Sequence, residues 1–114
     1  MSERILDEYY SRVLKSAATF CARWVGARAE LREVTTSHKT ATILLTKESS
    51  AQNLLVSCID PIRIEAPVRW ENATLSVVRA ELSNQDAGFL ITDPNGPLSI
   101  RCGSVEFAEN VKLR

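Results

Sequence analysis

The fold is decided by residues 2–34, which read SERILDEYYSRVLKSAATFCARWVGARAELREV. Apolar side chains recur there at alternating steps of four and three residues, the spacing of one face of an α-helix. Acidic residues gather near the start of the stretch and arginines near its end, as the helix dipole favours. The pattern predicts one long helix over residues 1–34, with an apolar stripe formed by Leu6, Tyr10, Val13, Ala17, Phe20, Trp24, Ala27, Leu31 and Val34.

Gly26 leaves a second interpretation open. A glycine in a helix interior costs about 1 kcal/mol relative to alanine, so the helix could stop near Val25 and residues 27–35 could run extended. Those residues are mostly good helix formers, and an alternation of period two would put charged Glu33 on the face of Leu31. We therefore expect the longer helix and keep the shorter one as the alternative.

From residue 39 onward the sequence changes to β-branched residues and short alternations, which indicate strands. Residues 54–59 are apolar on both faces except at one serine, which predicts a central strand. Pro61 and Pro67 bracket residues 62–65. Because proline lacks the N–H that a sheet ladder needs, we expect this segment at an edge or a bend.

The second half of the chain carries the clearest local signal, the turn sequence Asp93-Pro94-Asn95-Gly96. Aspartate can bond the turn backbone, proline sets φ, and asparagine and glycine tolerate the last two positions, so a hairpin is expected there. A strand is predicted over residues 74–82, where the apolar set changes parity and suggests either a bulge near Val77-Val78 or burial on both sides. Residues 97–102 alternate strictly, and Gly103 resets their phase.

These elements predict an α+β fold in one domain, residues 1–114. A long N-terminal helix (1–34) precedes an antiparallel meander of about six strands (39–114), either curved or partly closed into a barrel. No helical pattern alternates with the strands, as a parallel sheet would require.

Composition excludes several classes of protein. The 114 residues are 45% apolar and 25% charged, and no apolar run approaches the roughly 20 residues of a membrane span. Residues 1–47 carry eight Lys and Arg against five Asp and Glu (net +3), and residues 48–114 carry six against nine (net −3). Neither half has the charge of a nucleic-acid-binding domain. We expect no nucleic-acid partner and no membrane partner.

Catalytic chemistry is poorly supplied. The single histidine, His38, lies in a polar turn, and Cys58 and Cys102 fall on inward strand faces, where cysteine acts as a small hydrophobe. The three cysteines form no C-x-x-C pair, and the sequence begins without the basic and apolar segments of an export signal. We assign no catalytic residue, metal or cofactor, expect a cytoplasmic protein, and rank an enzyme using His38 or Cys58 below the other hypotheses.

The expected helix length predicts self-association. A compact domain of this size has a diameter of roughly 35 Å, whereas the long helix spans about 48 Å and would overhang it. The overhanging apolar stripe needs a cover, and the simplest cover is a second copy. The alternative is that the stripe lies across the protein's own sheet. We predict a homodimer whose interface includes Tyr10, Val13, Phe20, Trp24 and Leu31.

Two functional hypotheses follow. The first is a non-enzymatic, homo-oligomeric protein–protein interaction module, whose other partners the sequence does not name. The second is a protein that binds a small hydrophobic ligand in a cavity between the helix and the curved sheet. In that hypothesis Trp70 lines the mouth of the cavity, although taken by itself Trp70 fits better as a cap on one end of the sheet. The expected lining is Leu54, Val56, Trp70, Leu98, Ile100 and Phe107.

Overall fold

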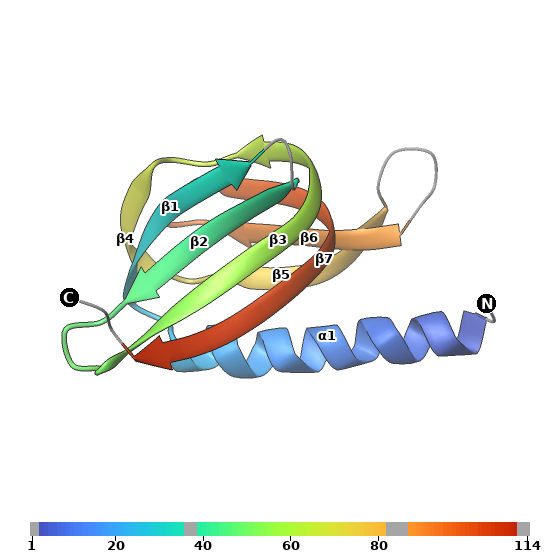
Figure 1. Ribbon diagram of the computed structural model, residues 1–114, viewed down its shortest axis with the longest axis horizontal. Helices are drawn as coiled ribbons and strands as arrows, with labels where there is room; N and C mark the ends of the chain where they lie inside the picture. Colours follow the sequence, from blue (N-terminus) through green and yellow to red (C-terminus); the bar gives the residue numbers. More distant parts are fainter. Residues whose placement is uncertain (1–2, 36–38, 82–86, 112–114) are drawn as a thin grey trace.

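One helix and a seven-stranded antiparallel sheet make up the part of the chain that the computed structural model describes, residues 3–35, 39–81 and 87–111 (Figure 1). The α+β prediction is confirmed, with seven strands among these residues where about six were expected. The elements are α1 (Glu3–Arg23), β1 (Ala27–Thr35), β2 (Thr40–Thr46), β3 (Gln52–Glu65), β4 (Arg69–Ala73), β5 (Ser76–Glu81), β6 (Ala87–Asp93) and β7 (Leu98–Val111).

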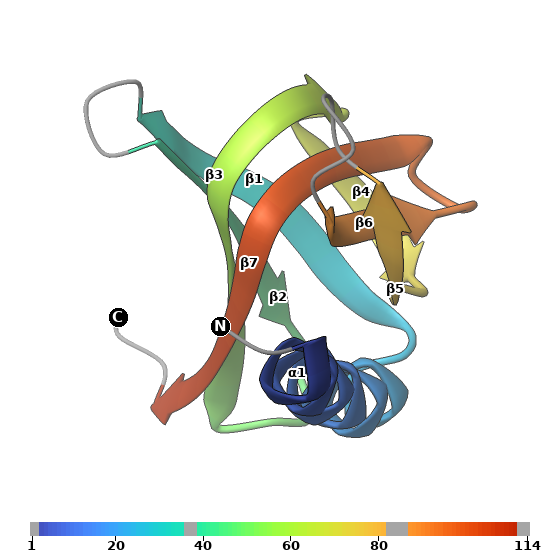
Figure 2. The ribbon, with the colours of Figure 1, turned by 90° about the vertical axis from the view of Figure 1, so that its right-hand side faces the viewer.

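The sheet curls into a half-barrel with the strand order β4-β1-β2-β3-β7-β6-β5. Its two end strands, β4 and β5, are consecutive in the sequence, so the sheet must curl to bring its ends near each other. Figure 2 looks along the helix and shows α1 on the open side of the curl, with β7 on one flank and β5 on the other. The helix therefore covers the interior that the sheet leaves open.

The prediction of a helix over residues 1–34 is wrong, and the alternative at Gly26 is correct. α1 ends at Arg23, and Gly26 adopts a positive φ of 88° that other residues rarely adopt. The Gly26 amide donates to the carbonyl of Ala73 (2.8 Å), and β1 begins at the next residue. β1 is hydrogen-bonded to β2 on one edge and to β4 on the other, so tertiary pairing overrides the helix propensity of its residues.

A β-bulge explains why Glu33 does not share the face of Leu31, as a regular strand would require. The pairing of β1 with β2 shifts register between Leu31 and Glu33. The shift leaves Ala27 and Ala29 buried and Glu33 exposed, so no charge enters the core.

The shorter helix also removes the predicted overhang. Its 21 residues span about 32 Å, less than the 44 Å longest axis of the molecule. Trp24 and Tyr10 from the apolar stripe are buried by the protein's own sheet. A coiled-coil-like pairing through the whole stripe is therefore not available to this fold.

The prolines and the turn sequence behave largely as expected. β3 continues through Pro61 but bends there, with a φ of 53° at Asp60 and a register shift before Arg63. β2 pairs only with residues 53–59 of β3, so the rest of β3 is an edge. β6 and β7 form the predicted hairpin, in which Asp93 pairs with Leu98.

Both predicted explanations for the change of parity at Val77-Val78, a bulge and burial on both sides, are wrong. β5 pairs with β6 in unbroken register, and the change of parity reflects an end strand with both faces at least partly exposed. The phase change at Gly103 is confirmed, because Cys102 and Val105 are both buried. No described helix has both the length and the apolar character to span a membrane.

Candidate functional site

Tyr10, predicted at an interface, is an internal anchor. Its hydroxyl donates to the carbonyl of Ala87 (2.9 Å), and its ring packs against Phe89 at a centroid distance of 5.2 Å. The Arg79 guanidinium lies 4.2 Å from the ring centroid and forms an ion pair with Asp7 (3.0 Å). These contacts tie the middle of α1 to β5 and β6.

Trp24 anchors the C-terminal end of the helix. Its side chain is buried, and its Nε1 donates to Oε2 of Glu109 on β7 (2.9 Å). Arg23 forms an ion pair with the other oxygen of the same carboxylate. The half-buried Glu109 thus has two partners at the C-terminal end of α1, the last helical residue and the residue after it, and Trp24 is committed to contacts within its own chain.

Two of the predicted interface residues, Val13 and Phe20, remain half-buried on one flank of the helix. Phe20 stacks on Phe107 of β7 with a centroid distance of 5.4 Å and an angle of 13° between the rings. The fifth, Leu31, lies on β1 rather than on the helix. The five predicted residues therefore do not share one surface, and Val13 and Phe20 are the pair that stays together.

These two side chains line a groove between α1 and β7. The α1–β7 groove has a volume of about 340 Å³ and an apolar floor rimmed by one cation and one anion. Both rim charges are exposed, and within the described residues neither forms an ion pair. The groove is lined by Arg12, Val13, Ser16, Phe20, Val105, Glu106 and Phe107.

The other flank of the helix carries a second depression of about 390 Å³, the α1–β5 groove. Leu14 provides its half-buried apolar side chain, next in sequence to Val13 on the opposite groove. Two of its three charged lining residues are paired, because Asp7 binds Arg79, and Lys15 forms no ion pair within the described residues. The two grooves are therefore similar in size, but within the described residues only the α1–β7 groove carries both a cation and an anion without an ion-pair partner.

The predicted hydrophobic-ligand residues lie in the core. Leu54, Val56 and Ile100 are 0% exposed and belong to one continuous apolar cluster. Leu98 and Trp70 are buried in the same cluster, and Phe107 packs against its edge. The structure places these side chains in contact with one another, and ligand binding among them remains a prediction.

Trp70 caps the barrel end through a buried carboxylate. Its Nε1 donates to Oδ2 of Asp93 (2.8 Å), which also accepts from the backbone amide of Thr74 (2.7 Å). Oδ1 of Asp93 accepts from the amide of Asn95 (2.8 Å), as the turn sequence predicts. Asp93 is 1% exposed, and its three donors link the β6–β7 turn to the β4–β5 connection. This arrangement is that of a structural clamp.

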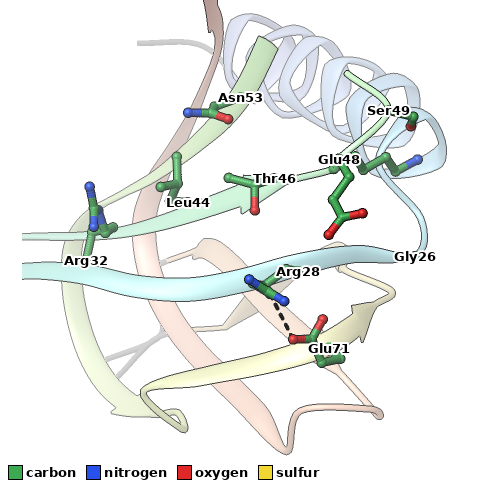
Figure 3. Close-up of a pocket in the computed structure, with 10 residues that line it drawn as sticks. Gly26, Arg28, Arg32, Leu44, Thr46, Glu48, Ser49, Asn53 and Glu71 are labelled. Atoms are coloured by element: carbon green, nitrogen blue, oxygen red, sulfur yellow. Dashed lines mark hydrogen bonds and ion pairs between the residues drawn. The ribbon is translucent and has the colours of Figure 1, made fainter. Parts of the chain in front are cut away.

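A wider polar depression of about 730 Å³ lies on the outer side of β1 and β2 (Figure 3). Arg28 points towards Glu71 across it, with 2.8 Å between Nε and Oε1. Lys47 donates to the carbonyl of Arg23 (3.0 Å), and Glu48 adds a second acid to the lining. Charges of both signs are interleaved here, so the depression does not select a ligand by charge.

Of the two groups considered for catalysis, His38 and Cys58, the structure describes only the cysteine. His38 lies outside the described residues. Cys58 and Cys102 are buried as expected, and a hydrogen bond with Cys102 together with burial raises the pKa of the Cys58 thiol. Burial raises the pKa of Cys21 to about 11. Among the described residues no three His, Cys, Asp or Glu side chains form a cluster that could hold a metal ion.

Comparison with family models, with curated proteins and with solved structures found no match to this chain. Sequence reasoning missed Arg12 and Glu106 as rim residues of the α1–β7 groove, and it missed that β7 continues to Val111 although its pairing with β6 ends at Cys102. One signal was present, because a second alternation at Val105 and Phe107 follows Gly103, whereas the apolar run before the turn is short.

Proposed function

We propose that this protein is a self-associating interaction module and that a second copy of the chain occupies the α1–β7 groove. The groove carries the proposal, because its apolar floor lies between two opposite charges that have no ion-pair partner in the described residues. A surface used by both members of a two-fold dimer must be complementary to itself. A cation on one wall and an anion on the other meet that requirement, since each can face its opposite in the second copy.

The apolar part of the groove supplies the driving force. Val13 and Phe20 keep part of their surface in contact with water, and so does Phe107 on the facing strand. Covering apolar surface contributes roughly 25 cal/mol per Å² removed from water. Aromatic side chains at the centre of a contact commonly dominate its energetics. A second copy that covers this floor therefore gains most from Phe20 and Phe107.

The matched pair Val13→Glu and Leu14→Glu tests the proposal. The two residues are adjacent and both half-buried, but they line opposite grooves. In light scattering coupled to size exclusion, wild type and Leu14→Glu should have a mass near twice 12.7 kDa, and Val13→Glu should be monomeric. Circular dichroism is the control that checks whether both variants fold. Equal masses for the two variants would contradict the choice of groove.

A charge exchange tests the complementarity directly. Arg12→Glu and Glu106→Arg each place like charges on both sides of the contact, so each should weaken the dimer by about tenfold or more. The double variant restores opposite charges and should recover most of the affinity, measured by sedimentation equilibrium. Both positions are exposed, so the fold should tolerate the changes. A double variant weaker than either single variant would show that these charges do not face each other.

A further inference from the structure

The strand β7 extends beyond the end of β6, so the edge of β7 that faces away from β3 has no neighbouring strand there among the described residues. β6 pairs with residues 98–102 of β7, whereas β3 pairs with β7 along its whole length to Val111. From Ser104 onward, no strand in the described part of the chain lies on the edge opposite β3. In an antiparallel sheet the N–H groups of alternate residues point to opposite edges. Residues 104–110 therefore present a row of backbone donors and acceptors without a strand partner.

This open edge borders the α1–β7 groove. The groove walls include Val105, Glu106 and Phe107, which lie within the open segment. Side chains from α1 reach over the inner face of the strand, as the stack of Phe20 on Phe107 shows. An incoming strand would therefore find hydrogen-bonding groups on one side and apolar helix side chains on the other. That combination is typical of sites where an extended segment adds to a sheet.

We infer that β7 pairs antiparallel with β7 of a second copy, so that the two half-barrels share one continuous sheet. The inference rests on the proposed self-association and specifies how the two copies join. A strand paired with its own copy in antiparallel direction is related to it by a two-fold axis, which is the symmetry that the self-complementary groove requires. The pairing also places each α1 beside the other copy's open edge, where Arg12 can reach Glu106 of the partner subunit.

Residue-resolved amide hydrogen exchange on the wild-type protein tests this pairing. Exchange is followed at concentrations where the protein is mostly monomeric and mostly associated. On association, alternate amides within residues 104–110 should slow by about tenfold or more, and the amides that already bond β3 should not change. β5 provides an internal control, because it is an end strand of the sheet whose edge takes no part in the pairing.

The outcomes separate the two proposals. Concentration-dependent protection of alternate β7 amides, with β5 unchanged, supports strand pairing. Association without any change in the β7 amides overturns the pairing and leaves self-association through the groove intact. Protection that appears on β5 instead of β7 also overturns it, because the wrong edge is then covered. A protein that stays monomeric throughout overturns both proposals.

Discussion

Replacing Gly96 by alanine should break the clamp that holds the β6–β7 turn against Trp70. A Cβ at this position would lie 2.4 Å from both Cγ and Cδ1 of Trp70 and 2.5 Å from its Nε1. Real Cβ atoms do not approach other atoms so closely, so the indole must move. Its hydrogen bond to Asp93 then breaks, and the buried carboxylate loses one of its three donors.

The magnitude follows from two contributions. Overpacking a well-filled site costs about 1–3 kcal/mol. Losing a hydrogen bond to a charged group costs about 1.5–3 kcal/mol. Gly96→Ala should therefore lower the free energy of unfolding by about 3–5 kcal/mol, a large share of the roughly 5–15 kcal/mol typical of a domain. Urea unfolding followed by tryptophan fluorescence measures the change.

Gly103→Ala is the matched control. The nearest atoms to a Cβ at that position are 3.6 and 3.7 Å away, which is ordinary van der Waals contact. Its free energy of unfolding should stay within about 1 kcal/mol of wild type. In a Trp70→Ala background the Gly96→Ala change should also cost little, because the ring it strikes is gone. Equal losses in Gly96→Ala and Gly103→Ala, or an unchanged cost in the Trp70→Ala background, would refute the reasoning.

Two further changes test other parts of the structure. Asp93→Asn keeps one acceptor oxygen but turns an NH₂ group towards a donor, so the free energy of unfolding in urea should fall by about 2–3 kcal/mol. A variant as stable as wild type would mean that the carboxylate charge is not needed. For Cys21, burial raises the pKa from 9.0 to about 11, so the folded state holds the thiol proton more tightly than the unfolded state. The contribution of the protonated Cys21 thiol to stability is complete below pH 9 and is lost as the pH rises towards 11. Thermal melts of wild type and Cys21→Ala should therefore differ in melting temperature by an amount that changes with pH only in that range.

Local signals in the sequence were sufficient for several elements. The hairpin at Asp93 depends on four consecutive residues, and its geometry follows from their own backbone preferences. The bend at Pro61 likewise depends on the missing N–H of one residue. Both could be predicted because neither needs a distant partner.

The wrong predictions concern segments whose structure depends on residues far away in the sequence. Residues 27–35 favour a helix by composition, yet they form β1 because β2 and β4 bond both of its edges. The helical stripe correctly indicated a buried face, but its periodicity could not say whether a second copy or the protein's own sheet covers it. Asp93 also has a second role that its turn sequence does not reveal, because its partners Trp70 and Thr74 lie on β4 and in the β4–β5 connection.

The candidate site was only partly within reach of sequence reasoning. Val13 and Phe20 were predicted as interface residues from the stripe, and the structure places them beside a groove. Arg12 and Glu106 gave no signal, because an exposed charge at helical or strand spacing is usually solvated. Their position on one groove depends on how β7 crosses α1, which only the assembled fold defines.

Self-association is tested most directly by the mass of the unmodified protein in solution. Sedimentation velocity measures this mass over about a hundredfold range of concentration. We expect the weight-average mass to rise with concentration from 12.7 kDa towards twice that value and then to level off, because a two-fold contact closes on itself. A mass that stays at 12.7 kDa throughout would contradict self-association, and a mass that keeps rising beyond the dimer would contradict a closed two-fold contact.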